Sequence, residues 1–564
     1  MKRVFRWAVL VACLAVVPLG GSDWVTHSGN NQRDGWQRDE TKITKDTLKN
    51  LQLLWKVKID ARQRSVYSLF GPLIVERAIT DRGFKELAFV ATTTNDLVAI
   101  DADLGTTFWT RHFDWQAELP ETQTASFLCP GGLTAWPVLP PGPGRGRGER
   151  GPGQPPGAGP GQPPVAPLPA PPEAARGEQP LTPGAPPRGN NPFTIRPIFV
   201  LSGDGYLHQV NINTGDEMIP AMPFLPPNGK PYSLAYRNNV IYTITGQGCG
   251  GNPNSVYSID LSEPEKTVRY WRSGSGGLWG IAGPAIGGDG TVYAETGDGQ
   301  YDPETNRYAN SIVALTPGDL KLKDWYTPSN AEWLWKRDLD MNVTPVVFKY
   351  KERELLVGSG KEGRLFMLDS QSLGGPDHRT PLFRTDLISN EAIDFAGAGT
   401  WGSLASWEDA QETRWVLAPV WGPIHSAFKF PATNGETRSG SIAAFKVEER
   451  EGKPALAPVW VSRNLIAPSP PAIVNGIVFA LSTGEWIRQA NEKEGGLYQA
   501  DVRVQRSTNA VLYALDAATG AELWSSGNQV TSFTHFAAVA IANGRVYFTT
   551  YDNTVYCFGI PMEH

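Results

Sequence analysis

Short apolar runs alternate with glycine-containing polar turns along much of the chain. The clearest case is the run Leu512–Leu515, which is followed by the turn Asp516–Gly520 and by Trp524. A short apolar run bounded by turn residues predicts a buried β-strand. In such a turn Asp bonds to its own backbone, and Gly supplies the positive φ. The tryptophan then opens a second strand with a large ring that needs burial.

This pattern is an internal repeat. Residues 514–524 read ALDAATGAELW and residues 99–109 read AIDADLGTTFW, with Ala, Asp, Gly and Trp at the same spacing. Repetition of one unit is the mark of repeat architectures, and a strand, a turn and a Trp-bearing strand form the outer hairpin of a propeller blade. Weaker copies place the Trp-strand position at 55, 109, near 219, 271, 325, 383, 460 and 524, although the positions near 219 and at 383 lack Trp.

These eight positions predict an all-β fold, an eight-bladed β-propeller of four-stranded antiparallel blades with tryptophan-docking repeats. The strand Leu53–Val57 has no blade before it, and the strands Arg545–Phe548 and Thr554–Phe558 have no Trp strand after them. We therefore expect the N- and C-terminal strands to pair and close the ring.

The N-terminus has the features of an export signal. Basic residues precede the apolar run Trp7–Leu19, and small residues follow it, so residues 1–22 are predicted to be a signal peptide and residues 23–564 one propeller domain. The alternative is a lipoprotein anchored through Cys13, because Leu10–Cys13 has a lipobox-like order. Either signal predicts a periplasmic or secreted protein, with no transmembrane segment after the signal is removed.

A Pro/Gly-rich segment at about 138–192 interrupts the repeats. It has almost no aromatic or β-branched residues and is predicted to be a disordered insert. With 51 basic and 57 acidic residues, the net charge of −6 gives no indication of a nucleic-acid partner.

Three cysteines remain after export. Cys129 and Cys249 both lie in Gly-rich loops, whereas Cys557 lies in an apolar strand, so the first two are the favoured disulfide pair and three free thiols are the alternative. There is no Cys-x-x-Cys-His sequence, and we expect no haem.

The repeats, the eight blade positions and the export signal resemble the quinoprotein alcohol dehydrogenase-like β-propellers over essentially the whole mature chain. That family includes dehydrogenases that use pyrroloquinoline quinone (PQQ), and it also includes non-catalytic propellers. In the dehydrogenases PQQ stacks on a Trp, a Glu and an Asn bind Ca²⁺, an Asp acts as base, and a Lys or Arg lies beside the quinone carbonyl. A disulfide between adjacent cysteines covers the other face.

The resemblance implies a cofactor site in this chain. Trp279 is similar to the stacking Trp, Asp298 falls at the Asn metal ligand, Asp338 resembles the catalytic Asp, and Lys361 resembles the quinone-facing Lys. Asp340 lies beside Asp338 and reads only as a second turn residue.

Two positions depart from the family. The Glu ligand is absent, since the chain reads Thr245–Gly248 there, and the adjacent cysteine pair is reduced to Cys129. Gln247 then offers a neutral oxygen, and Asp298 a carboxylate, so the implied metal ligands are Asp298, Asp338 and Gln247. Cys129 and Cys249 are assigned to the cofactor site with Trp279 and Lys361.

The leading functional hypothesis is a quinoprotein dehydrogenase that oxidises an alcohol or a sugar with PQQ and Ca²⁺ and passes electrons to a separate periplasmic acceptor. The alternative is a non-enzymatic scaffold that binds a protein partner. A third hypothesis is a carbohydrate- or peptide-binding propeller, in which Trp401 and Trp421 form an exposed binding surface.

Overall fold

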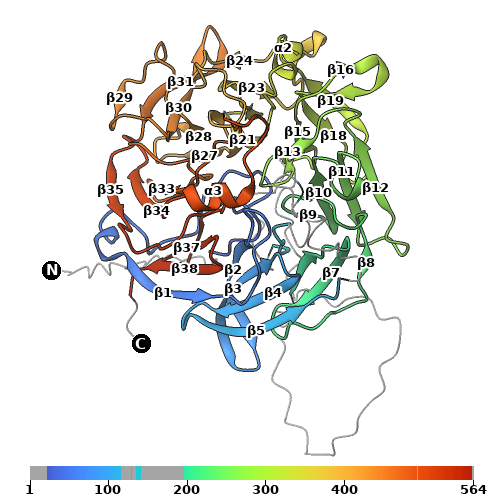
Figure 1. Ribbon diagram of the computed structural model, residues 1–564, viewed down its shortest axis with the longest axis vertical. Coiled ribbons are helices and arrows are strands. Elements are labelled where there is room, and N and C mark those ends of the chain that lie inside the picture. The colour runs from blue at the N-terminus through green and yellow to red at the C-terminus, as the bar shows by residue number, and fades with distance from the viewer. Residues whose placement is uncertain (1–21, 116–128, 130–134, 142–195, 492, 562–564) are drawn as a thin grey trace, which may run out of the picture.

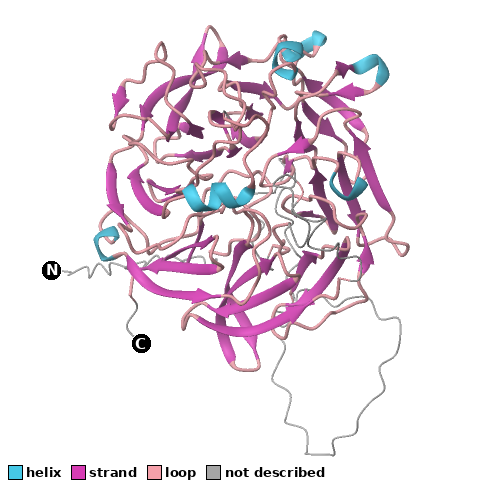
Figure 2. Cartoon of the chain, viewed as in Figure 1, coloured by secondary structure: helices cyan, strands magenta, loops and turns pink. Residues whose placement is uncertain are grey.

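The chain forms a ring of small antiparallel sheets (Figure 1, Figure 2). The computed structural model describes residues 22–115, 129, 135–141, 196–491 and 493–561. These residues build eight successive blades, and so the predicted eight-bladed all-β propeller is confirmed. Within the same residues, no helix has the length and apolar character needed to cross a membrane.

The first four blades take up the N-terminal half of the ring. Blade 1 contains β2 (Leu69–Thr80), β3 (Gly83–Thr92), β4 (Asp96–Asp101) and β5 (Thr106–His112). Blade 2 contains β6 (Pro197–Leu201), β7 (Tyr206–Asn211) and β8 (Met222–Pro223). Blade 3 contains β9 (Ala235–Arg237), β10 (Val240–Thr245), β11 (Ser255–Asp260) and β12 (Val268–Arg272). Blade 4 contains β13 (Leu278–Trp279), β14 (Ala285–Ile286), β15 (Val292–Thr296), β18 (Ile312–Leu315) and β19 (Leu322–Tyr326).

The remaining blades complete the circle. Blade 5 contains β21 (Val346–Tyr350), β22 (Arg353–Ser359), β23 (Leu365–Asp369) and β24 (Phe383–Arg384). Blade 6 contains β25 (Gly399–Thr400), β27 (Ala405–Glu408), β28 (Arg414–Trp421), β29 (Ala432–Thr433), β30 (Gly440–Arg450) and β31 (Lys453–Val461). Blade 7 contains β32 (Ala472–Val474), β33 (Ile477–Ser482), β34 (Val511–Asp516) and β35 (Glu522–Ser525). Blade 8 contains β36 (Ala540–Ala542), β37 (Arg545–Thr550), β38 (Thr554–Gly559) and β1 (Gln52–Lys58).

Short elements in the loops supplement the blades. They are the strand pairs β16 (Tyr301–Asp302) with β17 (Arg307–Tyr308) and β20 (Val343–Thr344) with β26 (Gly402–Ser403), the helices α2 (Ala331–Trp335) and α3 (Ala500–Arg506), and the 3-10 turns η1 (Leu48–Asn50), η2 (Cys249–Gly251), η3 (Pro303–Thr305) and η4 (Gly375–Asp377). In Figure 1, α3 crosses the inner side of the ring rather than its rim.

Blade 8 closes the ring as the sequence predicts. The N-terminal strand β1 pairs antiparallel with the C-terminal strand β38, from Gln52 opposite Gly559 to Lys58 opposite Thr554. Across the next blade boundary the buried Arg545 bonds to Glu86 of blade 1 and, at 2.6 Å, to Asp103. The two ends of the chain are therefore held by backbone bonds and by buried ion pairs.

The repeated tryptophan fastens one blade to the next. In three blades its indole Nε1 donates to a carbonyl in the turn of the following blade: Trp55 to Ala102 (2.9 Å), Trp109 to Ile212 (3.0 Å) and Trp460 to Ala517 (3.0 Å). The turn glycine lies under the ring, and a Cβ at Gly520 would come within 2.4 Å of the Trp460 indole. Gly520 also has a φ of 73°, which favours Gly. These two requirements explain the Gly and Trp of the repeat.

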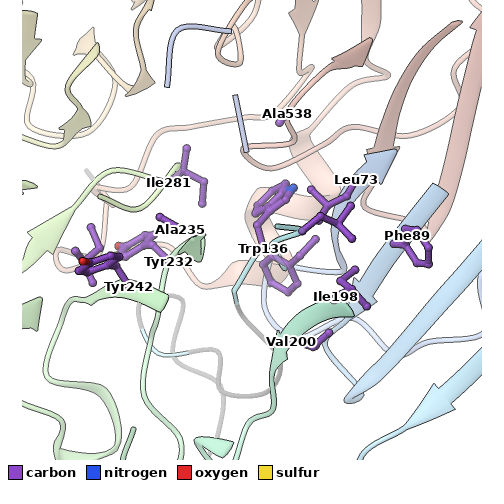
Figure 3. Packing of buried hydrophobic residues seen from close by; sticks show 14 of the residues in the cluster. Leu73, Phe89, Trp136, Ile198, Val200, Tyr232, Ala235, Tyr242, Ile281 and Ala538 are labelled. Atoms are coloured by element: carbon purple, nitrogen blue, oxygen red, sulfur yellow. The ribbon is translucent and has the colours of Figure 1, made fainter. Parts of the chain in front are cut away.

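The two blade positions without Trp are also occupied by outer strands. The position near 219 is filled by β8, and the position at 383 by β24. Apolar side chains then form a core that runs from blade to blade. In Figure 3, Leu73, Ile198, Val200 and Tyr242 come from blades 1 to 3, and Trp136 lies among them.

Residues at two predicted boundaries are buried in the fold. Val138 and Leu139, predicted to open the insert, are buried, and Val138 forms a β-bridge with Phe199 of blade 2. They are apolar and complete the inner edge of that blade. Ser22, predicted to end the export signal, is buried, and its carbonyl accepts a bond from Gln37 (2.8 Å). The rest of the signal and of the insert lies outside the described residues.

Candidate functional site

Three carboxylates and one lysine meet near the inner ends of blades 4 and 5. Asp298 follows β15, Asp338 and Asp340 lie between α2 and β20, and Lys361 follows β22. Each position is set by a loop that leaves a buried strand or a short helix. Asp338 has a φ of 54°, a conformation that Asp adopts more readily than most residues. The ring thus gathers residues that are up to 63 positions apart in the sequence, from Asp298 to Lys361.

The backbone holds this group together. The Asp298 amide donates to Asp340 Oδ1 (2.6 Å), and the Lys361 amide donates to the Asp340 carbonyl (2.9 Å). Lys361 Nζ lies 3.0 Å from Asp338 Oδ1 and also contacts Asp340 Oδ2. One carboxylate oxygen from each Asp lies within 4.8 Å of the others, a spacing that suits one metal ion. We call Asp298, Asp338 and Asp340 the acidic cluster.

Burial divides the roles within the acidic cluster. The side chains of Asp340 and Lys361 are 2% and 6% exposed, whereas that of Asp338 is 50% exposed. Asp340 is therefore the structural centre, and Asp338 is the carboxylate that a soluble molecule can reach. Asp338 was predicted from the sequence as a site residue and Asp340 only as a turn residue, so Asp340 is a site residue that the sequence did not reveal.

The acidic cluster carries more negative charge than Lys361 neutralises. Burial and the neighbouring Asp340 carboxylate raise the pKa of Asp298 to about 8. Burial also raises the pKa of Asp338 to about 6, although Lys361 opposes the shift. For Asp340, burial acts in the same direction, but the Lys361 ammonium and the bonds from Asp298 outweigh it and hold the pKa below its ordinary value. A bound cation would favour ionisation of all three.

Substitution of Asp298 by Asn tests this charge balance. A carboxyl with a pKa of about 8 in the fold and about 3.9 in the unfolded chain stabilises the fold at low pH and loses that contribution as the pH rises towards 8. Without added cations, the difference in thermal midpoint between the variant and the wild type should increase in favour of the variant by about 1–2 °C as the pH is raised from 5 to 8.5. Asp386→Asn, at an exposed position, is the control. Parallel pH profiles for wild type and Asp298→Asn would contradict the assignment.

Trp279 borders the acidic cluster through a glycine. A Cβ at Gly297 would lie 2.2 Å from Asp340 Oδ1 and 2.5 Å from Trp279 Cδ1, so no larger residue fits between the indole and the carboxylate. Trp279 is half-buried in β13 and pairs with Glu295 of β15. The predicted stacking residue is thus an immediate neighbour of Asp340, the buried member of the acidic cluster.

Aromatic side chains enclose a small cavity beside this group. Its volume is about 20 Å³, room for about one water molecule, and its larger lining side chains are Tyr67, Tyr232, Trp279, Asn342, Trp401 and Phe536. The Lys361 ammonium lies 5.4 Å from the Trp401 ring. We call this space the aromatic slot.

Trp401 and Trp421 do not form an exposed surface, so this part of the third hypothesis is wrong. Their side chains are 5% and 3% exposed, and their rings stack at 4.7 Å. The Phe536 ring continues the stack, 5.5 Å from Trp421. The position of both indoles on inner strands and loops explains their burial.

Several polar atoms at the aromatic slot have no hydrogen-bond partner among the described residues. They are the Tyr232 hydroxyl and both polar atoms of the Asn342 amide, and all three are buried. Buried polar groups in native proteins are nearly always paired, so these atoms indicate that a molecule, of which one water is the smallest, occupies the aromatic slot.

A buried cation adds to this indication. Lys230 is 4% exposed, and its ammonium lies 5.4 Å from the Trp279 ring and 5.7 Å from the Tyr67 ring. None of the described residues forms an ion pair with it. Burial lowers the pKa of Lys230 to about 7, and Arg503 contributes to the shift. Lys230 was not identified from the sequence, because a single lysine in a loop carries no pattern.

A buried ion network, which was not predicted from the sequence, lies beside the aromatic slot. Arg503 of α3 donates to Glu485 Oε1 (2.6 Å), and His535 Nδ1 lies 2.8 Å from Glu485 Oε2. His535 packs edge-on against Tyr67, with ring centroids 4.7 Å apart. The network ties the loop that carries α3 to the loop before β36 and supports the wall of the aromatic slot.

The remaining predicted residues lie in the loop after β10. Cys249 forms a disulfide with Cys129, as predicted, and Cys557 is free and buried. The backbone nitrogen of Gln247 lies 3.3 Å from the position of a Cβ on Gly277, close to Trp279. The structure gives no hydrogen bond between the Gln247 side chain and the described atoms of the acidic cluster. The third carboxylate of the cluster comes from Asp340 instead.

Comparison with known proteins supports the fold. A PQQ-repeat family model, described as outer membrane protein assembly factor BamB, matches residues 460–560. No curated protein sequence matches the chain.

Solved structures with the same fold share little sequence with this chain. A quinohemoprotein alcohol dehydrogenase from Comamonas testosteroni has 13% identity and a TM-score of 0.57, over 96% of this chain and 81% of that one. One from Pseudomonas putida HK5 has 11% identity and a TM-score of 0.55, over 96% and 82%. A europium-containing methanol dehydrogenase has 12% identity and a TM-score of 0.54, over 95% and 98%.

Proposed function

We propose that this chain, whose residues 460–560 match a PQQ-repeat family model, is an exported quinoprotein dehydrogenase that oxidises an alcohol or a sugar and passes the electrons to a separate periplasmic acceptor. The observation that carries the proposal is that Trp279 lines the aromatic slot and that Lys361 and the acidic cluster lie directly beside it. The solved dehydrogenases of the same fold make this reaction class the natural one to test.

The residues of the aromatic slot fit a planar, anionic cofactor in kind. Aromatic rings form its walls, Lys230 supplies a buried positive charge, and the unpaired atoms of Tyr232 and Asn342 can donate to ring oxygens or accept from ring N–H groups. PQQ has these features. The aromatic slot holds only about 20 Å³ as it stands, so the side chains around it must move apart to admit three fused rings.

The acidic cluster fits a divalent cation. Three carboxylates against one ammonium favour Ca²⁺, which binds oxygen ligands with flexible geometry. Asp298, Asp338 and Asp340 would hold the ion in this proposal, while Gln247 remains a neutral candidate on the neighbouring loop. Ca²⁺ at this place would polarise an oxygen of a bound cofactor or substrate.

Asp338 is proposed as the base. Its carboxylate is half-exposed and, with a pKa of about 6, is ionised at neutral pH, so it can take the proton of a substrate hydroxyl. Lys361 holds Asp338 in place through its 3.0 Å contact and offers positive charge where an oxygen becomes negative. Bound PQQ would supply the two-electron acceptor for the carbon–hydrogen bond of the alcohol.

The test is a titration of the mature protein with PQQ, with and without Ca²⁺, followed by tryptophan fluorescence. Saturable quenching that needs Ca²⁺ and is lost in Trp279→Ala is the expected result. Trp524→Phe, in the outer strand β35, is the matched control and should leave the titration unchanged. In a dye-linked assay with alcohols and sugars, Asp338→Asn should lower the rate at least about 100-fold.

The second candidate function is a periplasmic scaffold without catalysis. The small volume of the aromatic slot and the missing Glu ligand at Thr245–Gly248 favour it. Absence of PQQ binding at micromolar concentrations, with and without Ca²⁺, would reject the dehydrogenase proposal and leave the scaffold. A scaffold would bind its partner through residues outside the acidic cluster, so Asp338→Asn should leave that binding unchanged.

A further inference from the structure

The boundary between blades 5 and 6 lacks the tryptophan fastening described above. Phe383 in β24 occupies the Trp position of blade 5. In blade 6 the strands β30 and β31 run on for 11 and 9 residues, so their turn lies far out at Glu451 and Gly452. A Cβ on Gly452 would have no atom within 4 Å, whereas one on Gly520 would meet the Trp460 indole at 2.4 Å. This boundary therefore has neither a Trp in blade 5 nor a turn Gly of blade 6 beneath it. The structure describes every residue from 346 to 461 here.

An open groove takes the place of the missing indole. Its volume is about 560 Å³, within the range of ligand-binding clefts. It lies between the outer strands of the two blades, and its lining is Arg364, Phe383, Thr385, Asp386, Leu387, His425, Ala427, Phe428, Lys429, Arg450, Leu456 and Pro458. We call it the β24–β31 groove.

The groove has an apolar floor. Phe383, Phe428 and Pro458 are half-buried, so each leaves part of its surface to solvent, while Leu456 is buried below them. Phe383 and Phe428 pack against the core of blades 5 and 6. A large apolar side chain placed here would cover the faces that remain exposed, as the Trp rings do at other boundaries.

The rim of the groove is basic, although the whole chain is acidic. Arg364, Lys429 and Arg450 line it against a single acidic residue, Asp386. Arg450 forms an ion pair with the exposed Glu448 (2.7 Å), and Arg364 lies 3.5 Å from Glu362. Part of the positive charge on the rim is therefore neutralised within the protein. Among the described residues, Lys429 donates only to the Ser426 carbonyl (2.7 Å) and forms no ion pair. The rim therefore favours a negatively charged occupant.

The edge of blade 5 is open at the same place. β24 is the outermost strand of its sheet, and within the described part of the chain it forms a ladder only with β23, at Phe383 opposite Met367 and Arg384 opposite Phe366. An extended segment can bind along such an edge while its side chains reach neighbouring pockets.

We propose that the β24–β31 groove binds an extended segment of a partner protein in which one aromatic side chain is flanked by acidic residues. The aromatic side chain takes the place of the missing indole, and the acidic residues meet Lys429, Arg450 and Arg364. This proposal concerns the outer rim of the ring and does not depend on the function proposed for the aromatic slot.

The test uses the whole mature protein and a fluorescein-labelled peptide, Gly-Asp-Glu-Trp-Asp-Glu-Gly, followed by fluorescence anisotropy. Two comparison peptides carry Ala in place of Trp or Lys in place of each acidic residue. The Trp-containing acidic peptide should bind at least tenfold more tightly than either. Equal affinity for the acidic and the basic peptide, or no binding at millimolar concentration, would overturn the proposal.

Variants then locate the binding site. The pair Lys429→Glu with Arg450→Glu should weaken peptide binding at least tenfold, while Lys321→Glu, an exposed lysine on blade 4, should leave it unchanged. Phe383→Trp should fill the groove and abolish binding while the thermal midpoint holds or rises. If neither the double variant nor Phe383→Trp changes peptide binding, the peptide binds elsewhere on the protein and the proposal for the groove is rejected. PQQ titration of the same variants should match the wild type.

Discussion

Replacement of Lys361 by Met is expected to lower the free energy of unfolding by about 3–5 kcal/mol, because it leaves the buried Asp340 carboxylate without a neutralising positive charge. An isolated charge cannot be rehydrated at a side chain that is 2% exposed. Unfolding in urea at pH 7 with EDTA measures the change. A loss below about 1 kcal/mol, the usual value of an exposed ion pair, would show that the contact is incidental.

A second variant separates charge from packing. Lys361→Met combined with Asp340→Asn removes both charges and should recover most of the lost stability. If the acidic cluster accepts a divalent cation, millimolar Ca²⁺ should also restore stability to the single variant, because the ion replaces the ammonium. If the double variant recovers stability but Ca²⁺ does not restore it to the single variant, the unpaired charge explains the loss and the cation site is rejected.

Removal of the disulfide by Cys129→Ser with Cys249→Ser is the other change with a large expected effect. The bond spans 120 residues, and the loop-closure argument gives about 4–5 kcal/mol for a loop of this length. Denaturant unfolding should show this loss in the double variant. Reducing agent should lower the wild-type stability to the same value and leave the double variant unchanged. If the double variant unfolds like the wild type, the bond does not constrain the unfolded chain.

The fold was predictable because its signal is local. The Gly and Trp of each repeat lie within a dozen residues of each other, and at three blade boundaries the Trp contacts the turn Gly of the following blade. Gly520 makes room for the Trp460 ring, which donates to the backbone of the same turn. Ring closure was also predictable, because the N-terminal strand and the C-terminal strands each form part of an incomplete blade, and the two parts complete one blade when they pair. The number of blades was predicted correctly even where Phe383 replaces Trp, because strand spacing carries the same information.

The site was predictable only where the resemblance supplied a pattern. Trp279, Asp298, Asp338 and Lys361 were found in family order, and the structure places them together. Asp340 was missed, because two acidic residues in one loop cannot be ranked without burial. Glu485 and Arg503, which lie in the connection between β33 and β34, and Lys230, which lies before β9, were missed because isolated charges in loops carry no periodicity.

The pairing of β1 with β38 has a consequence for biosynthesis. Blades 1 to 7 can each form their hairpins as the chain emerges, but blade 8 waits for the final strand to meet a partner about 500 residues earlier in the chain. Until that meeting, the exposed edge of β37 and the unpaired strand β1 are templates for pairing with other chains. The nascent protein is thus most prone to aggregation just before its last strand arrives, and a holding chaperone would matter most at that moment.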